Sequence, residues 1–301
     1  MSDTINREYE ASLKSIETEN YPDQWFYRPI GFRIAKMLCN TKITPNMITV
    51  ISIFVGAAAG PLFYCNSLLL ILLGIVSLVI ANILDCVDGQ LARLTGIKSE
   101  IGRILDGFAG DIWFTLIYVF LALKLKNEYG TGLFFIPAAI AGLSHLVQAN
   151  ITDYYKTLHL LFVSREKGKE FQDLDEVRSQ YRKNKSIIGK VLFFFYIGYT
   201  SLQESATPKL QRMLKTFRSK YGDDIPEDIR LDFRQRSERL MKRCIDFMTF
   251  NGRTFVLFLV VPTGCVWIYF IYEIVVLNVI LAISIRKHEK ICAKITERVE
   301  T

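Results

Sequence analysis

The sequence predicts an all-α integral membrane protein with six transmembrane helices, an N-terminal interfacial helix and a helical cytoplasmic insertion. Half of the 301 residues are hydrophobic, and the mean hydropathy is +0.23. Several apolar stretches approach the roughly 20 residues that an α-helix needs to cross a bilayer. The polar, charged first 20 residues predict no cleavable signal peptide. These observations exclude a soluble enzyme.

Net charge and cysteine content indicate which partners and which cysteine chemistry to expect. The formal charge of +7 suits contact with anionic lipid or a phosphorylated substrate, although cytoplasmic loops of membrane proteins are usually basic. No nucleic-acid partner is expected. The six cysteines are scattered and show no metal-binding spacing, so a disulfide framework is not expected either.

Four segments are expected along the chain. Residues 1–42 form a cytoplasmic segment that ends in an interfacial helix over 21–42, whose apolar side chains dip into the headgroup region. The alternative for residues 21–42 is a soluble amphipathic helix packed on the body of the protein. Residues 43–155 hold transmembrane helices one to four. Residues 156–244 form a basic cytoplasmic insertion with an interfacial helix. Residues 245–301 hold transmembrane helices five and six and a cytoplasmic tail.

The first four spans follow from apolar runs and breakers. Thr44 is the expected cap of the first span and Pro45 its first helical residue. The spans are expected at 46–64, at 67–84, from within the acidic motif described below to Leu123, and at 132–152. Residues 89–100 are expected to form a turn region with Gly89 and Gly96 as breakers, and residues 124–131 a polar loop.

The basic insertion and the last apolar run need separate arguments. If residues 187–202 crossed the bilayer, residues 205–250 would carry eleven Lys and Arg to the outside, against the positive-inside tendency, so this patch is expected at the interface. The apolar run 254–285 would be about 48 Å long as one helix, too long for a hydrocarbon core of roughly 30 Å. Pro262 and Gly264 therefore divide it into spans at 245–261 and 265–285. Six spans place both termini and the acidic motif on the cytoplasmic side, in the inner membrane if the protein is bacterial.

Four carboxylates lie within 27 residues, between two apolar runs: Asp85, Asp88, Asp106 and Asp111. Carboxylates at a membrane boundary are costly to desolvate and usually mark a functional site. Asp85 and Asp88 share one helical face, and a second helix is expected to return Asp106 to the same depth. Oxygen-only ligation suits a hard divalent cation, namely Mg²⁺, Mn²⁺ or Ca²⁺. The alternatives are an acidic loop that binds nothing and a path for divalent-cation transport.

The spacing of these residues is specific. Asp85-x2-Asp88-Gly89-x2-Ala92-Arg93-x8-Gly102-x3-Asp106 resembles the signature of the CDP-alcohol phosphatidyltransferase family, and the phosphatidylinositol phosphate synthase-like branch is favoured. The Thr44-Pro45-Asn46 start is similar to that of the family as well. The family's fourth aspartate would stand at position 110, where this sequence has glycine, and an aspartate follows only at Asp111.

The resemblance implies a six-helix core, a homodimer and metal-dependent transfer of a phosphatidyl group from CDP-diacylglycerol to an alcohol, with release of CMP. It implies that Asp85, Asp88 and Asp106 hold two metal ions, and that Asp111 completes the metal site and acts as the base. Gly89, Ala92 and Arg93, together with Asp85, match the CDP-binding positions. The residue chemistry agrees, because small residues admit a nucleotide and the Arg93 fork suits phosphate oxygens.

The acceptor alcohol is predicted from basic and polar side chains near the same membrane face: Lys98, Arg103, His145, Gln148 and Arg253. Such a set suits a phosphorylated polyol, and inositol phosphate is the favoured acceptor. The cations could instead snorkel to lipid headgroups, and the polar side chains could satisfy one another. Competing functions are transfer from a CDP-amino alcohol such as CDP-ethanolamine or CDP-choline to diacylglycerol, and a non-catalytic relative that has lost its base.

The one-residue offset of Asp111 carries a geometric prediction. Five residues along an α-helix correspond to a rotation of about 140° away from Asp106, whereas four correspond to about 40°. A π-bulge between Asp106 and Asp111 would cancel the offset, and such bulges occur preferentially at functional sites. The sequence therefore predicts a widened turn here, with both carboxylates facing Asp85 and Asp88. On this view, Gly110→Asp does not rescue Asp111→Asn.

Overall fold

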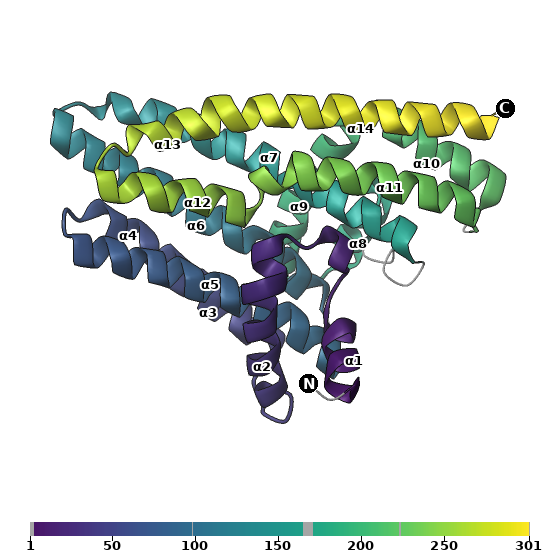
Figure 1. Cartoon of the computed structure of the whole chain (residues 1–301), viewed down its shortest axis with the longest axis horizontal. Helices are drawn as coiled ribbons and strands as arrows, with labels where there is room; N and C mark the ends of the chain where they lie inside the picture. Colours follow the sequence, from purple (N-terminus) through teal and green to yellow (C-terminus); the bar gives the residue numbers. More distant parts are fainter. Residues whose placement is uncertain (1–2, 98, 165–170, 223, 301) are drawn as a thin grey trace. The chain divides into compact units, whose positions relative to one another are not determined.

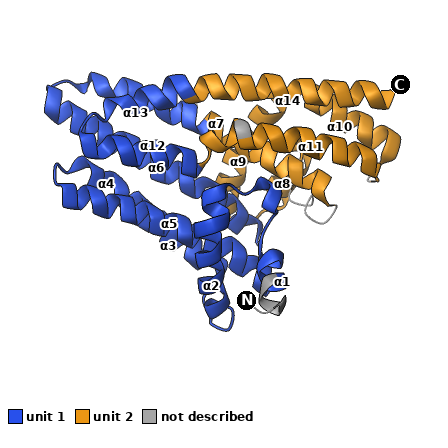
Figure 2. Cartoon of the chain, in the orientation of Figure 1, with its two compact units in different colours: residues 1–146, 250–276 blue, residues 147–249, 277–301 orange. Residues whose placement is uncertain are grey.

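A computed structural model describes residues 3–97, 99–164, 171–222 and 224–300, and within these ranges the chain is helical, with no strand. This confirms the all-α class. The chain divides into two compact units, which Figure 2 colours separately. Unit 1 comprises residues 1–146 and 250–276, and unit 2 comprises residues 147–249 and 277–301. Each unit is described by itself.

Unit 1 holds most of the apolar helices. Figure 1 labels these helices along the chain. Its membrane part runs through α3 (Pro45–Ala57), α4 (Ala59–Tyr64), α5 (Leu68–Thr95), α6 (Glu100–Tyr129), η3 (Gly132–Phe134), the first part of α7 (Phe135–Val163), α12 (Phe250–Val260), η6 (Val261–Thr263), α13 (Trp267–Ile271) and the π-helical η7 (Tyr272–Val276). Thr44 caps α3 by accepting the backbone N–H of Met47, and Pro45 opens the helix, as predicted.

The described part of the chain contains five helices that are long and apolar enough to cross a membrane. They lie at Pro45–Tyr64, Leu68–Thr95, Glu100–Tyr129, Gly132–Val163 and Trp267–Glu300, and the shorter Phe250–Thr263 is also apolar. The expected fifth span is therefore present only as a short helix that begins at Phe250. An integral membrane protein follows from these helices.

Two expected loops are helical instead. α5 continues through Gly89 and ends only at Gly96, whose φ of 73° forms a left-handed C-cap. The predicted turn region 89–100 is thus wrong for its first half, because one glycine inside a packed helix weakens it without ending it. Residues 124–129 are helical rather than a polar loop. Lys124 and Leu125 are buried there, so packing extends α6 to Tyr129, and Gly130 caps it.

The N-terminal segment of unit 1 packs against α5. It contains α1 (Asp3–Ser12), η1 (Ile16–Thr18), the π-helical η2 (Asp23–Tyr27) and α2 (Arg28–Leu38). The expected helix at 21–42 is therefore present over 21–38. α2 approaches α5 closely at Gly31, where a Cβ would lie 2.6 Å from Gln90 Oε1. A larger residue there would force the two helices apart.

Unit 2 combines the insertion with the last helix. It holds the rest of α7, then α8 (Leu174–Lys183), α9 (Ile187–Ala206), α10 (Pro208–Tyr221), α11 (Glu227–Arg243), η5 (Ile245–Met248) and α14 (Leu277–Glu300). α9 is not among the five candidate spans, and the interfacial placement of residues 187–202 stays a prediction. α14 runs on to Glu300, so the predicted tail is the end of a continuous helix.

The core of unit 2 is aromatic. Phe162 stacks on Phe233 with ring centroids 4.0 Å apart and meets Phe217 edge-on at 6.0 Å. α10 and α11 both pack along α14. Ion pairs at the surface, such as Arg298 with Asp228 at 2.7 Å, add little to this core because they are exposed. Buried aromatic area therefore holds the unit together.

Candidate metal and nucleotide site

Three of the four expected carboxylates meet in unit 1. Asp85 and Asp88, one turn apart near the end of α5, face Asp106 in the first turns of α6, and one oxygen of each lies within 4.8 Å of the others. Asp88 is buried, whereas Asp85 and Asp106 are partly exposed. The expectation that α6 returns Asp106 to the other two agrees with this geometry, and metal binding itself stays a prediction.

The start of α3 holds this arrangement in place. Thr49 Oγ1 donates a 2.6 Å hydrogen bond to Asp88 Oδ2, which fixes that carboxylate from a neighbouring helix. Asn46 Nδ2 donates to Ser99 Oγ, the cap of α6. Asn46 comes so close that a Cβ on Gly102 would lie 2.1 Å from its Oδ1. A side chain at Gly102 would therefore have to displace Asn46 and Ser99, which link α3 to the start of α6.

The donor set fits a hard divalent cation. Three carboxylates within 4.8 Å repel one another when all are ionised, and their oxygens are the ligands that Mg²⁺ and Mn²⁺ prefer. The guanidinium of Arg28 interacts electrostatically with Asp85 and Asp88. One such positive charge does not balance three negative ones, so the group still favours added cations.

The expected nucleotide-binding residues lie one turn further along α5. The guanidinium of Arg93 passes over Gly89, where a Cβ would lie 3.1 Å from Arg93 Nη2. Arg93 Nε donates a 2.5 Å hydrogen bond to the carbonyl oxygen of Ser12, at the end of α1. Ala92 is partly exposed on the same helix. The N-terminal segment therefore positions Arg93.

Sequence reasoning missed two residues of this site. Arg28 forms a 3.0 Å ion pair with Glu19, and its backbone oxygen accepts a hydrogen bond from Gln90 Nε2. No local pattern distinguished Arg28 from other basic residues of the expected interfacial helix. Thr49 lies one turn after the predicted cap and start of α3, but only the packing of α3 on α5 shows that it reaches Asp88.

Asp111 does not join the carboxylate group. α6 is a regular α-helix from Glu100 to Tyr129, so the predicted widened turn after Asp106 is wrong. Asp111 Oδ1 instead lies 3.6 Å from His145 Nε2, on the opposite side of the helix as a rotation of about 140° requires. Ala109 and Trp113, on either side of Asp111 in the sequence, are both buried within this regular helix.

Gly110 is the residue four positions after Asp106. A Cβ at Gly110 would meet nothing within 4 Å, so the space there is open. An α-helix turns a residue at this position to within about 40° of Asp106. The structure therefore does not support the expected roles of Asp111 as metal ligand and base.

Two expected acceptor-binding residues lie in one buried polar network. Tyr118 Oη and His145 Nδ1 are 3.0 Å apart, and Arg253 acts electrostatically on the same imidazole. Arg253 itself forms an ion pair with Glu273, and the two side chains are 1% and 0% exposed. Arg253 is thus already paired in an apolar interior, as a charge there requires, rather than standing at an open site.

The other expected acceptor residues lie elsewhere. Gln148 belongs to unit 2, where its Nε2 donates a 2.8 Å hydrogen bond to Asn278 Oδ1. Arg103 is partly exposed on the first turns of α6. Lys98 lies outside the described residues. Within unit 1 the structure brings His145 and Arg253 together, and the acceptor-binding role of the five residues stays a prediction.

Comparison with known proteins shows what this region is similar to. Residues 42–169 match the family described as CDP-alcohol phosphatidyltransferase. This part of the chain therefore resembles a CDP-alcohol phosphatidyltransferase domain. The match covers the whole acidic motif and His145, and it leaves out the N-terminal segment with Arg28 and most of unit 2.

A curated relative adds detail. An archaetidylinositol phosphate synthase from Pyrococcus horikoshii (strain OT-3) is 42% identical over 74 residues. The matched stretch covers 25% of this chain and 38% of that relative. This likeness favours the inositol phosphate-related branch of the CDP-alcohol phosphatidyltransferase family.

Proposed function

We propose that this chain transfers a phosphatidyl group from CDP-diacylglycerol, or a similar CDP-linked lipid, to a polyol, with inositol phosphate as the favoured acceptor. The observation that carries the proposal is the meeting of Asp85, Asp88 and Asp106 within a domain of this family. The name of the Pyrococcus relative supports an inositol phosphate acceptor. We also infer that the site faces the cytoplasm and that the protein is a homodimer, as the family resemblance implies.

In this mechanism the three carboxylates would hold Mg²⁺ or Mn²⁺, which when bound supply charge neutralisation and orientation to a diphosphate. The acceptor oxygen attacks the phosphorus that bears the lipid, and the bond from that phosphorus to the CMP oxygen breaks. Arg93 offers its guanidinium to the phosphate oxygens beside Gly89. Arg28, which already acts on Asp85 and Asp88, adds positive charge to the same region.

The attacking hydroxyl must lose a proton. Because Asp111 faces His145, we place the proton acceptor among the partly exposed carboxylates of the group, Asp85 or Asp106. Asp88 is less suited, since it is buried and its Oδ2 already accepts a hydrogen bond from Thr49. Asp111 then acts on the fold of α6 rather than on the reacting atoms.

The test is an assay of CMP release by the full chain in detergent or nanodiscs. One arm combines CDP-diacylglycerol or its archaeol analogue with inositol phosphate, inositol, glycerol phosphate or serine. A second arm combines CDP-ethanolamine or CDP-choline with diacylglycerol. The proposal expects metal-dependent CMP release in the first arm, highest with inositol phosphate. Release confined to the second arm, or none with any pair, contradicts it.

A further inference from the structure

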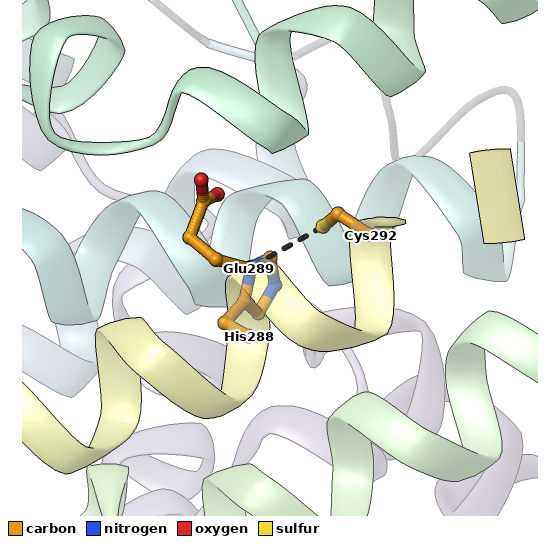
Figure 3. A group of neighbouring side chains, drawn as sticks. All are labelled: His288, Glu289 and Cys292. Carbon is orange, nitrogen blue, oxygen red and sulfur yellow. Dashed lines mark hydrogen bonds between the residues drawn. The ribbon is translucent and has the colours of Figure 1, made fainter. Parts of the chain in front are cut away.

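A second group of potential metal ligands lies far along the sequence, on the last helix. His288, Glu289 and Cys292 occupy two consecutive turns of α14 and are all buried (Figure 3). One ligand atom from each lies within 4.8 Å of the others. These residues lie beyond the expected sixth span, which ends at 285, and outside the matched domain. Neither the domain nor the proposed reaction uses them.

The spacing of the imidazole and the thiol suits a tetrahedral ion. His288 Nδ1 and Cys292 Sγ are 3.5 Å apart, and Figure 3 shows the contact as a dashed line. Zinc–nitrogen bonds of about 2.0–2.1 Å and zinc–sulfur bonds of about 2.3 Å at a tetrahedral angle separate the two ligand atoms by about 3.5–3.6 Å. An ion can therefore replace the proton that the two atoms share, without moving either.

Glu289 is held in place from another helix. Its Oε2 accepts the backbone N–H of Lys209 at 2.7 Å, and its Oε1 accepts that of Leu210 at 3.1 Å. Glu289 thereby caps the start of α10 from α14. A carboxylate has about four lone-pair positions, so these two bonds leave capacity for a cation.

Aromatic rings hold the imidazole of His288 in place. The rings of His288 and Tyr155 stack with centroids 3.9 Å apart, and Phe233 meets His288 edge-on. His288 Nε2 and Tyr155 Oη are buried and have no hydrogen-bond partner among the described residues. The ion would bind Nδ1 and not Nε2, so these contacts orient the ring and add no ligand.

We propose that His288 Nδ1, Cys292 Sγ and a Glu289 oxygen bind Zn²⁺, with water as the fourth ligand, as a structural link within unit 2. Nitrogen, sulfur and carboxylate donors in tetrahedral geometry suit zinc, in contrast to the all-oxygen carboxylate group of unit 1. Binding releases the thiol proton of Cys292 to solvent, and the thiolate and the Nδ1 lone pair bind the ion. Because Glu289 also caps α10, the ion would stiffen the contact between α10 and α14.

The test is the zinc content of the full chain, purified in detergent without chelator. The proposal expects about one zinc per chain for the wild type and less than about a tenth of that for Cys292→Ser. Cys244→Ser in the same unit is the matched control and should keep its zinc. Asp106→Asn should keep it too, which separates this site from the carboxylate group and from the proposed reaction.

A measurement on the wild type avoids any misfolding of the variants. X-ray absorption of the zinc-loaded chain should show one sulfur neighbour at about 2.3 Å. Replacement by Co²⁺ should give a thiolate-to-cobalt charge-transfer band. Zinc uptake below a tenth of an equivalent, full uptake by Cys292→Ser, or zinc without a sulfur neighbour each overturns the proposal. In the last two cases the thiol and imidazole form only a hydrogen bond.

Discussion

The carboxylate group of unit 1 and the His–Glu–Cys group of unit 2 each gather three potential ligands within 4.8 Å, yet they differ in chemistry and in exposure. Asp85, Asp88 and Asp106 offer only oxygen, and two of the three are partly exposed. His288, Glu289 and Cys292 offer nitrogen, oxygen and sulfur, and all three are buried.

This difference separates two uses of a metal. A partly open, all-oxygen site leaves positions for water and substrate phosphates, as a reaction requires. A site whose three ligand side chains are all buried is shielded from substrate, and we expect it to act on stability. We therefore expect changes in the carboxylate group to affect turnover and changes in the buried group to affect folding.

The largest expected effect is on turnover. Asp106→Asn should lower CMP release by at least about 100-fold, because the lost carboxylate both holds metal and lies beside the developing charge. Unfolding temperature and zinc content should hardly change. Exposed Asp175→Asn is the matched control and should keep full activity. If the Asp106→Asn protein keeps its activity, the carboxylate group does not serve turnover and the two groups do not differ in this way.

A buried charged pair without metal provides a second contrast. Removing one partner, by Arg253→Met or Glu273→Gln, should destabilise the protein by about 3–5 kcal/mol, since the other charge is left buried and unpaired. The double variant Arg253→Met with Glu273→Leu should recover much of this loss. Denaturant or thermal unfolding in detergent measures the effect. If the single variants are as stable as the wild type, Arg253 is not held by Glu273.

Removal of metal should separate the two groups directly. A strong chelator should abolish CMP release and also lower the unfolding temperature. Mg²⁺ added back should restore turnover, whereas only Zn²⁺ should restore the unfolding temperature. Recovery of both properties with Mg²⁺ alone would show that a single kind of site accounts for both.

The smallest expected effects are at the offset aspartate. Asp111→Asn should lower CMP release less than about tenfold, because its carboxylate faces His145 and not the group. Gly110→Asp should fold normally, since a Cβ there meets nothing within 4 Å. Its added carboxylate should lower the Mg²⁺ concentration that half-maximal CMP release requires. A complete loss of turnover in Asp111→Asn would restore the sequence-based prediction for the base.

Local patterns were enough for the class and for much of the site. Apolar runs predict membrane helices because an α-helix satisfies its own backbone in lipid. Thr44 and Pro45 mark the start of α3 because capping and proline geometry act within one turn. Asp85 and Asp88 share a face because three residues make almost one turn. These features depend only on residues near one another in the sequence.

Other features depended on packing between distant segments. The extension of α5 through Gly89 and of α6 through Lys124 comes from burial against neighbouring helices, which outweighs a local helix breaker or charge. The direction in which Asp111 points relative to Asp106 depends on whether α6 is regular. A sequence cannot show whether a bulge cancels the one-residue offset of Asp111 from the motif. The expected motif spacing suggested a bulge, whereas α6 is a regular α-helix at this point.

The sequence by itself thus determined the membrane class, the start of α3 and the grouping of Asp85 with Asp88. Only the tertiary structure decided that Thr49 binds Asp88, that Arg28 lies beside the carboxylates, and that Glu289 caps a helix 79 or 80 residues away. Helical periodicity fixes which face a residue occupies. Which partner that face meets is decided by burial of apolar surface across the whole chain, and no local pattern records it.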